Sequence, residues 1–404
     1  MKKISKNIKQ KIIAKVLIIL AIIYPINNLT FATSSPNTPI VKFLTEAKIS
    51  KAQEDAFAIT NKLSKTYFNH CEIAKIVSTD RYYDKSSPTN LESSLDKAVK
   101  SGDLPIQNFT IEDMQKAKDS IVLNPEKNAK FILEENFDAI NLHEKNSCTD
   151  GDIVNLASQF NALESVRNEP TAVKYWPYDR TQGPYCALQS VAGTKHREAA
   201  HLQGKLADAL EDTLKNCKID GKAITKKYPN LYKGGYLELM EITNEKDMET
   251  FLKFLEDDKN LKNMKVLMQW VKCEGTGKKQ LQFFTAAPSF QSYSKKIWDS
   301  NSRIMDLRKK ACIKLVEIQY KIMAMAAAII SSQNGKNVRL HVCMVGHGAF
   351  NNPEETIHAA LKTLKEELNG IDATVLLQTR PGYSNIWEKG NPKELGINWE
   401  TLKN

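Results

Sequence analysis

The chain has 404 residues, of which 42% are hydrophobic and 26% are charged. These proportions are ordinary for a soluble globular protein and supply enough apolar side chains for a sizeable core. The formal net charge is +10, but six of the lysines stand in the first 15 residues and leave only +4 for the remainder. This mild charge, with no basic stripe interleaved with aromatic residues, argues against a nucleic-acid partner.

The first residues are typical of a secretory signal peptide. Six lysines lead into an apolar run from Val16 to Tyr24, and Ala32 offers a small-residue cleavage point. The run is shorter than the about 20 apolar residues that a membrane-spanning helix needs. We therefore predict that residues 1–32 are a signal peptide and that the mature chain is secreted or periplasmic, without stable membrane association. An uncleaved membrane anchor is the alternative.

The rest of the chain divides near residue 145. From Ile40 to about Leu142 apolar residues recur mostly at helical spacing, so residues 33–145 are predicted to be a mainly helical N-terminal portion. Over residues 146–404 strand and helix patterns alternate, which predicts a three-layer α/β/α domain with a mixed sheet. The apolar patch Ile322–Ile330 indicates a buried core helix. The expected strands are 152–156, 173–178, 235–242, 265–272, 280–285, 338–344 and, as the last one, 373–378, and the expected helices are 185–216, 248–255, 302–332 and 354–368.

Seven cysteines are scattered over the chain, and none forms a CxxC pair. We therefore expect no zinc site and no other cofactor, and the odd count does not indicate a disulfide framework. Cys312 and Cys343 lie in apolar patterns and are expected to be buried thiols. Passage through an oxidising compartment leaves open a pair such as Cys148 with Cys186.

A buried strand that begins at Val338 leads into a loop with the sequence GHGAFN, and Pro353 then suits the first turn of a helix. Two glycines around one residue let the backbone turn sharply and bring its N–H groups close to a ligand. A loop that feeds a helix N-terminus suits an anion such as phosphate, although an ordinary strand-to-helix turn has the same pattern. The residues of this loop expected to contact a ligand are Gly346, His347, Gly348, Ala349, Phe350 and Asn351.

A second loop opens into a helix at Pro184, and Asp179 stands at its mouth. Free N–H groups at the start of that helix would face a ligand, and a glycine permits close approach. Asn155, Asn161 and Glu164 follow an earlier strand, where turn and cap chemistry is the ordinary role for such residues. The residues of the second loop expected to contact a ligand are Thr181, Gln182, Gly183 and Pro184.

Three segments together resemble the macrodomains, a family of ADP-ribose-binding α/β/α domains. Residues 153–158, IVNLAS, resemble the family's strand IVNAAN. Residues 181–193 resemble its GGGV loop and the helix that follows. Residues 307–378 resemble its long helix, strand, G-x-G-aromatic loop, helix and last strand. Ser158, Thr181 and Gln182 depart from the family pattern. The stretches QFNALE (159–164) and DRTQGP (179–184) resemble replacements in a divergent branch of exported bacterial proteins that act on host ADP-ribosylation.

The resemblance implies an exported hydrolase whose partner is ADP-ribose or an ADP-ribosylated protein. Hydrolysis at the anomeric carbon needs a carboxylate or amide that positions water and an acid for the leaving group. We assign the catalytic roles to Asp179, Glu164 and Asn161, and expect Asn155 to bind the ligand with the two loops. Tyr185 stands where many family hydrolases carry an Asp. A non-catalytic module that binds ADP-ribose or another nucleotide is therefore the alternative.

Two other classes of enzyme are disfavoured. The chain has neither GxxxxGK[ST] nor GxGxxG, which argues against P-loop enzymes, kinases and dehydrogenases. A Cys-His hydrolase would use Cys186 with His196 or His347. Packing of the cysteine among small residues is the stronger interpretation of that stretch.

Overall fold

The computed structural model describes residues 38–67, 98, 109–135, 148–163, 190–273, 276–290, 302–348, 350–379 and 385–403. Thr38–Asn404 form one compact unit. The predicted signal peptide (residues 1–32) and the strand expected at 173–178 lie outside the described residues. Within the described ranges, no helix combines the length and apolarity that crossing a bilayer requires.

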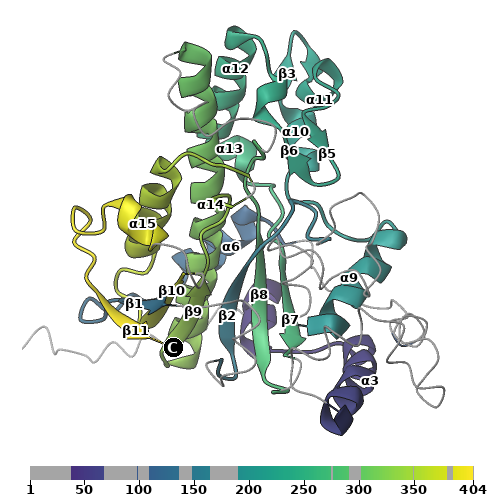
Figure 1. The fold of residues 1–404 in the computed structure, drawn as a ribbon, viewed down its shortest axis with the longest axis vertical. Helices are drawn as coiled ribbons and strands as arrows, with labels where there is room; N and C mark the ends of the chain where they lie inside the picture. Colours follow the sequence, from purple (N-terminus) through teal and green to yellow (C-terminus); the bar gives the residue numbers. More distant parts are fainter. Residues whose placement is uncertain are drawn as a thin grey trace, which may run out of the picture. The chain divides into compact units, whose positions relative to one another are not determined.

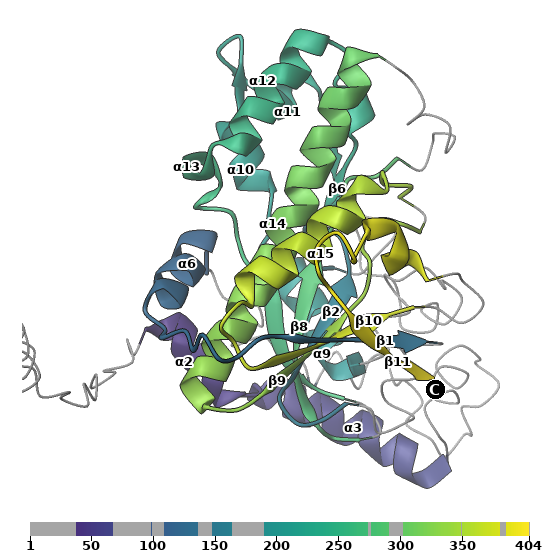
Figure 2. The same ribbon diagram turned by 90° about the vertical axis from the view of Figure 1, so that its left-hand side faces the viewer.

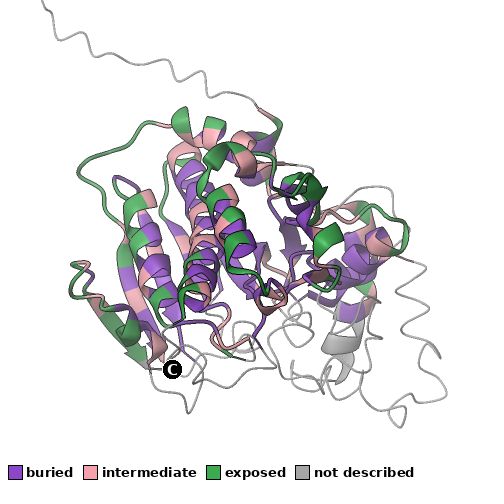
Figure 3. Ribbon diagram, turned by 90° about the horizontal axis from the view of Figure 1, so that it is seen from above, coloured by how far each residue is buried: buried purple, intermediate pink, exposed green. Residues whose placement is uncertain are grey.

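A seven-stranded sheet with the order β11-β1-β10-β9-β2-β8-β7 forms the centre of the fold (Figure 1). All neighbouring strands are parallel except the edge pair β7 and β8. Most strand residues are buried, as expected for parallel strands covered on both faces (Figure 3). The strands are β1 (Lys130–Glu135), β2 (Asp152–Ala157), β7 (Met268–Lys272), β8 (Lys279–Thr285), β9 (Val338–Val342), β10 (Ala373–Gln378) and β11 (Trp399–Lys403).

Helices cover both faces of this sheet. Trp270 of β7 donates from Nε1 to the carbonyl of Phe43 in α2, while its neighbour Gln269 accepts from Arg197 of α9. Successive strand side chains point to opposite faces, so α2 and α9 lie on opposite sides of the sheet. The long α14 packs against α2, α6, α12 and α15, and Figure 2 shows α14 and α15 side by side over one face. The fold is therefore mixed α/β, with a mainly parallel sheet between helices.

The larger helices begin and end as the periodic patterns require. The interior of α14 is apolar on all sides over Ile322–Ile330 and is buried, which confirms the predicted core helix. The helix ends at Gly335, whose φ of +60° is the left-handed cap conformation that favours glycine. The helices are α2 (Pro39–Glu46), α3 (Lys51–Tyr67), α6 (Ile111–Asp119), α9 (Val191–Leu202), α10 (Glu211–Asn216), α11 (Ile224–Lys227), α12 (Glu245–Glu256), α13 (Asp258–Leu261), α14 (Arg303–Asn334) and α15 (Glu355–Glu367), with the 3₁₀ turns η3 (Leu239–Glu241) and η5 (Ile386–Gly390) and the hairpins β3–β4 (Lys218–Ile219, Lys222–Ala223) and β5–β6 (Tyr232–Lys233, Tyr236–Leu237).

Two strands of the sheet are absent from the sequence prediction. β1 lies inside the portion expected to be mainly helical, and Phe131 and Leu133 on it are buried. β11 follows the strand expected to be the last one and pairs with β1. Sequence patterns miss β1 because its three apolar residues lie between a lysine and two glutamates, which are good helix formers. Its strand conformation depends on pairing with β10 and β11, which no local pattern reveals.

Two further expectations are corrected. The single helix expected over 185–216 is two helices, α9 and α10, because the chain turns at Gly204 with a φ of +63°. The strand expected over 235–242 is only the short β6, and η3 follows it directly. Cys312 and Cys343 are buried thiols as predicted, and Cys148 is also a buried free thiol, whereas Cys186 lies outside the described residues.

Candidate ligand-binding site

The carboxyl ends of β2 and β9 lie side by side, because these parallel strands pair through Ile153 with Leu340 and Val154 with His341. After β2 the chain continues to β8 and β7 on one side, whereas after β9 it continues to β10 on the other. In open α/β sheets ligands bind where the direction of the connections switches in this way. The loops after β2 and β9 therefore form the candidate site.

The predicted G-x-G loop begins at Gly346, and its geometry requires glycine there. The φ of Gly346 is +85°, and a Cβ atom would lie 2.6 Å from Cγ of Asn352 and 2.9 Å from Cβ of Ala287. Asn352 donates from its backbone to the carbonyl of Gly346 (3.0 Å) and from Nδ2 to the carbonyl of Pro288 (2.7 Å). Cys312 donates to Oδ1 of Asn352 (3.0 Å). The buried Asn352, which the sequence prediction omits, is thus the residue that fixes the turn.

Tyr320 of α14 fixes the entrance to the same loop. Its hydroxyl donates to the carbonyl of Cys343 (2.7 Å) and accepts from the backbone N–H of Val345 (3.0 Å). Burial raises the pKa of Tyr320 well above its ordinary value, so the hydroxyl keeps the proton that it donates. The core helix therefore holds the loop in place.

The N–H groups of the G-x-G loop are available for a ligand. Among the described residues, the backbone N–H groups of Gly346, His347 and Gly348 donate to no acceptor. Gly348 is exposed, and no described atom lies within 4 Å of the position that a Cβ atom would take there. Consecutive backbone N–H groups before a helix N-terminus favour an anion. Glu354 and Glu355 at the start of α15 form ion pairs with Lys389 and Lys309, which limits their repulsion of that anion.

His347 ties the loop to α15. The Thr356 hydroxyl donates to the carbonyl of Pro353 (2.6 Å), so its oxygen accepts a hydrogen bond from Nε2 of His347 (2.7 Å). Burial lowers the pKa of His347 to about 4, so the imidazole is neutral at physiological pH. His347 therefore connects the loop to α15 through a hydrogen bond, and its neutral ring places no positive charge near a bound anion.

We predict that the free energy of unfolding falls in acid, because the folded chain holds His347 in its neutral form. Its pKa is about 4 in the folded chain and about 6.5 when unfolded, so the stabilisation is complete above pH 6.5 and is lost as the pH falls towards 4. The loss reaches about 3 kcal/mol. His347→Gln keeps a donor towards Thr356 without titrating. Urea unfolding from pH 7.5 to pH 4 should show a smaller decline for the variant, and two parallel curves would refute the prediction.

Asn155 within β2 and Asn161 after it both have structural contacts. Asn155 is buried, accepts from Sγ of Cys343 at Oδ1 (3.2 Å) and donates to Thr285 of β8. Asn161 accepts from the backbone of Leu163 (3.1 Å) in a local turn. Its side chain also packs on Gly235, where a Cβ atom would lie 2.6 Å from Cγ of Asn161. Asn155 thus connects β2 to β8 and to the segment after β9, whereas Asn161 fixes the loop after β2, which is the ordinary role of such a residue after a strand.

The β5–β6 hairpin completes the site. The ring of Tyr236 meets the ring of Phe350 edge-on, with centroids 5.8 Å apart. The carbonyl of Phe350 accepts from the backbone of Phe290 (3.0 Å). Burial raises the pKa of Glu238, which also hydrogen-bonds to Ser289. Sequence patterns missed Tyr236 and Glu238, and their only local signal is the Gly-Gly turn that precedes them.

The structure brings Asn155, Asn161 and the G-x-G loop to one edge of the sheet. The other predicted site residues lie outside the described residues, and their roles stay predictions. They are the catalytic candidates Asp179 and Glu164 and the ligand-binding candidates Thr181, Gln182, Gly183, Pro184 and Ala349.

Comparison with known proteins gives no assignment: no family model matches the chain, and no curated protein matches it.

Proposed function

We propose that the protein is an exported macrodomain-type enzyme that binds ADP-ribose and removes it from ADP-ribosylated protein. The observation that carries the ligand class is the G-x-G loop at the switch point between β2 and β9. There the N–H groups of Gly346, His347 and Gly348 have no acceptor among the described residues. A pyrophosphate needs several such donors, and α15 adds the field of its N-terminus.

The order of elements supports the same proposal. β2 carries the IVNLAS stretch, and α14, β9, the G-x-G loop, α15 and β10 follow in the order that the macrodomain resemblance requires. Phe350 lies in that loop beside Tyr236, where an aromatic ring would stack on a ribose or close the site. The loop at residues 181–184 would hold the pyrophosphate from the other side.

Hydrolysis requires a carboxylate near the distal ribose. Asp179 is the first candidate because it ends a predicted strand at the mouth of the 181–184 loop, and Glu164 is the second. Glu238 lies two positions after Tyr236, whose ring meets Phe350 of the G-x-G loop, and burial raises the pKa of Glu238, which suits a group that gives up a proton. It is a further candidate for the acid.

A non-catalytic binding module is the second candidate function. Tyr185 replaces the acid that many macrodomain hydrolases carry. In addition, the amide of Asn161 is engaged in its local turn and against Gly235, so a catalytic role would require that turn to open. Both observations favour binding without hydrolysis.

Thermal unfolding with ADP-ribose tests the ligand class. At 100 times its Kd, a ligand that binds only the folded state stabilises it by about 2.7 kcal/mol. Gly348→Val should remove most of this stabilisation, because a branched side chain would occupy the space in front of the loop N–H groups. The substitution should leave the fold intact, since no described atom lies within 4 Å of a Cβ atom at this position.

Gly348→Ala is the matched control and should retain more of the affinity than Gly348→Val. Normal binding of ADP-ribose by Gly348→Val would remove the G-x-G loop from the site. Absence of any shift for the wild type with ADP-ribose would contradict the proposed ligand.

A further inference from the structure

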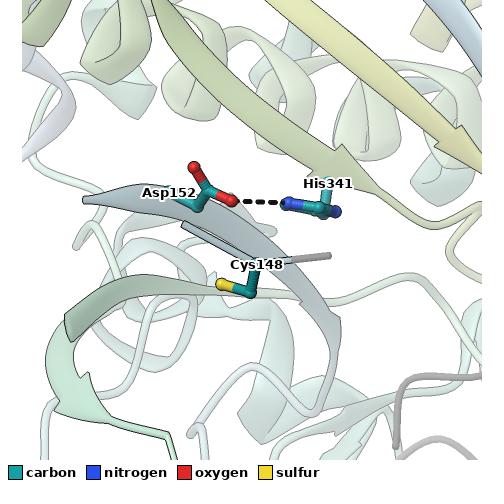
Figure 4. Close-up of side chains that lie close together, drawn as sticks. All are labelled: Cys148, Asp152 and His341. Atoms are coloured by element: carbon teal, nitrogen blue, oxygen red, sulfur yellow. Dashed lines mark hydrogen bonds and ion pairs between the residues drawn. The ribbon is translucent and has the colours of Figure 1, made fainter. Parts of the chain in front are cut away.

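A second polar cluster lies away from the loops of the candidate site. Side-chain ligand atoms of Cys148, Asp152 and His341 all lie within 4.8 Å of one another, and all three residues are buried (Figure 4). Nε2 of His341 is 2.9 Å from Oδ2 of Asp152. Cys148 donates from Sγ to Oε1 of Gln280 (3.5 Å). The cluster thus contains nitrogen, sulfur and oxygen donors.

Strand register places these side chains on one face of the sheet. Asp152 is directly opposite Gln280 of β8, and His341 of β9 is opposite Val154. Asp152 and Val154 are two residues apart on β2 and share a face, so His341 also points to that face. Cys148 reaches the cluster through the turn before β2, where Thr149 donates to Asp152 from its backbone (2.8 Å) and its hydroxyl (2.5 Å).

A second carboxylate stands behind the imidazole. Oε2 of Glu134 on β1 is 3.5 Å from Nδ1 of His341, and this oxygen accepts no hydrogen bond from the described residues. Metal-binding histidines ordinarily donate their other ring N–H to such a carboxylate, which fixes the ring and makes it a better ligand. The arrangement of Glu134, His341 and Asp152 therefore has the geometry of a metal ligand with its outer support.

We infer that Cys148, Asp152 and His341 bind a divalent cation of the Zn²⁺ type, with Oε1 of Gln280 or a water as the fourth ligand. Zn²⁺ accepts thiolate, imidazole and carboxylate ligands together at about 2.0–2.3 Å. Tetrahedral bonds of that length place ligand atoms roughly 3.3–3.8 Å apart. The observed separations, from 2.9 Å to at most 4.8 Å, bracket this spacing, so side-chain rotation suffices to close the site.

The charges around the cluster also suit a cation. Two carboxylates, Asp152 and Glu134, lie beside the imidazole of His341, and Arg339 is 3.7 Å from Asp152. A divalent cation here would be bound by Asp152 and would have Glu134 behind the imidazole, so buried carboxylates would pair with it.

Sequence patterns do not reveal this site, because zinc sites are recognised from closely spaced cysteines and histidines. Here Cys148 and Asp152 are 189 or more residues before His341, and the sheet brings them together. Binding would connect the turn before β2 to His341 on β9, the strand whose carboxyl end leads into the G-x-G loop.

Metal content and cobalt spectroscopy of the full chain test the inference. After loading with Zn²⁺ and removal of unbound ion, mass spectrometry should find about one Zn²⁺ per chain. Co²⁺ in the same site should show a thiolate-to-cobalt charge-transfer band. Cys148→Ser should abolish the band and weaken Zn²⁺ binding at least about 100-fold. Cys217→Ser is the matched control: Cys217 is also a buried free thiol and should leave band and affinity unchanged.

Glu134→Gln provides a variant that keeps all three ligands. It should weaken Zn²⁺ binding about 10- to 100-fold and retain the cobalt band, because Glu134 supports His341 without touching the ion. The inference fails if the wild type retains no Zn²⁺, or if the cobalt band persists in Cys148→Ser. Either result would leave the cluster as a hydrogen-bonded ion pair beside a thiol.

Discussion

Asp179→Ala is expected to slow the release of ADP-ribose from an ADP-ribosylated protein by about 10²- to 10⁴-fold, the range of general acid–base help. The sequence predicts that Asp179 stands at the mouth of the 181–184 loop, which in the proposed macrodomain-type site would face the distal ribose. A carboxylate there would orient the attacking water and take up its proton as the glycosidic bond breaks. The affinity for ADP-ribose should stay within about tenfold, or 1.4 kcal/mol, because the pyrophosphate is bound elsewhere.

Single-turnover assays on folded protein measure this effect. Glu164→Ala should slow turnover less if that side chain only positions the ribose. Glu256→Ala, a change at an exposed position of α12, is the control and should leave turnover unchanged. Wild-type turnover in Asp179→Ala would remove Asp179 from the mechanism. Failure of the wild type to act on any linkage would favour the binding module instead.

Glu238→Gln tests whether Glu238 supplies the proton for the leaving group, a role separate from the base role of Asp179. Glu238 follows β6, whose Tyr236 contacts Phe350, and burial raises its pKa. If Glu238→Gln loses turnover and keeps its affinity for ADP-ribose, Glu238 is the proton donor, whereas unchanged turnover removes it from the mechanism. This residue could not be proposed from the sequence, because the hairpin contacts residues more than 50 positions away.

Long periodic segments were predictable from the sequence. The strands β2, β8, β9 and β10 are apolar runs bounded by turn residues, and α14 and α15 carry patterns that extend over many turns. The G-x-G loop was also predictable, since Gly346 does adopt a conformation that favours glycine. These features depend on residues that are close in the sequence, so local sequence patterns predict them.

Features that depend on distant pairing were not predictable. β1 is a strand because β10 and β11 pair with it on either side. Asn352 fixes the turn at Gly346 because its side chain forms hydrogen bonds with Cys312 and Pro288. Asn161 shows the same dependence on partners: the sequence places it after a strand, and the structure shows that its Oδ1 accepts from the backbone of Leu163 in a local turn. A residue's place along the chain indicates which loop it belongs to, whereas its partners decide what its side chain can do.

Arg197→Leu is expected to lower the free energy of unfolding by about 3 to 5 kcal/mol, since each buried group left without a partner costs about 1–3 kcal/mol. Arg197 of α9 is fully buried and lies over the ring of Phe284, 4.2 Å from its centroid. It donates to the carbonyl of Ala162 (3.1 Å), to Oε1 of Gln269 (2.7 Å) and to Thr194 (3.0 Å). Leucine fills part of the space but donates to none of these acceptors.

The effect should extend to the candidate ligand-binding site. Ala162 has a φ of +55°, an unfavourable conformation for a residue with a Cβ atom, and Arg197 holds its carbonyl. Without that bond the loop after β2 should relax, and ADP-ribose affinity should fall together with stability. Urea unfolding measures the change in stability, and calorimetry measures the change in ADP-ribose affinity.

Arg303→Leu is the control. It removes an exposed arginine that forms ion pairs with Glu245 and Glu249, and should change stability by no more than about 1 kcal/mol. An equally small change in Arg197→Leu would show that the loop keeps its conformation without the guanidinium.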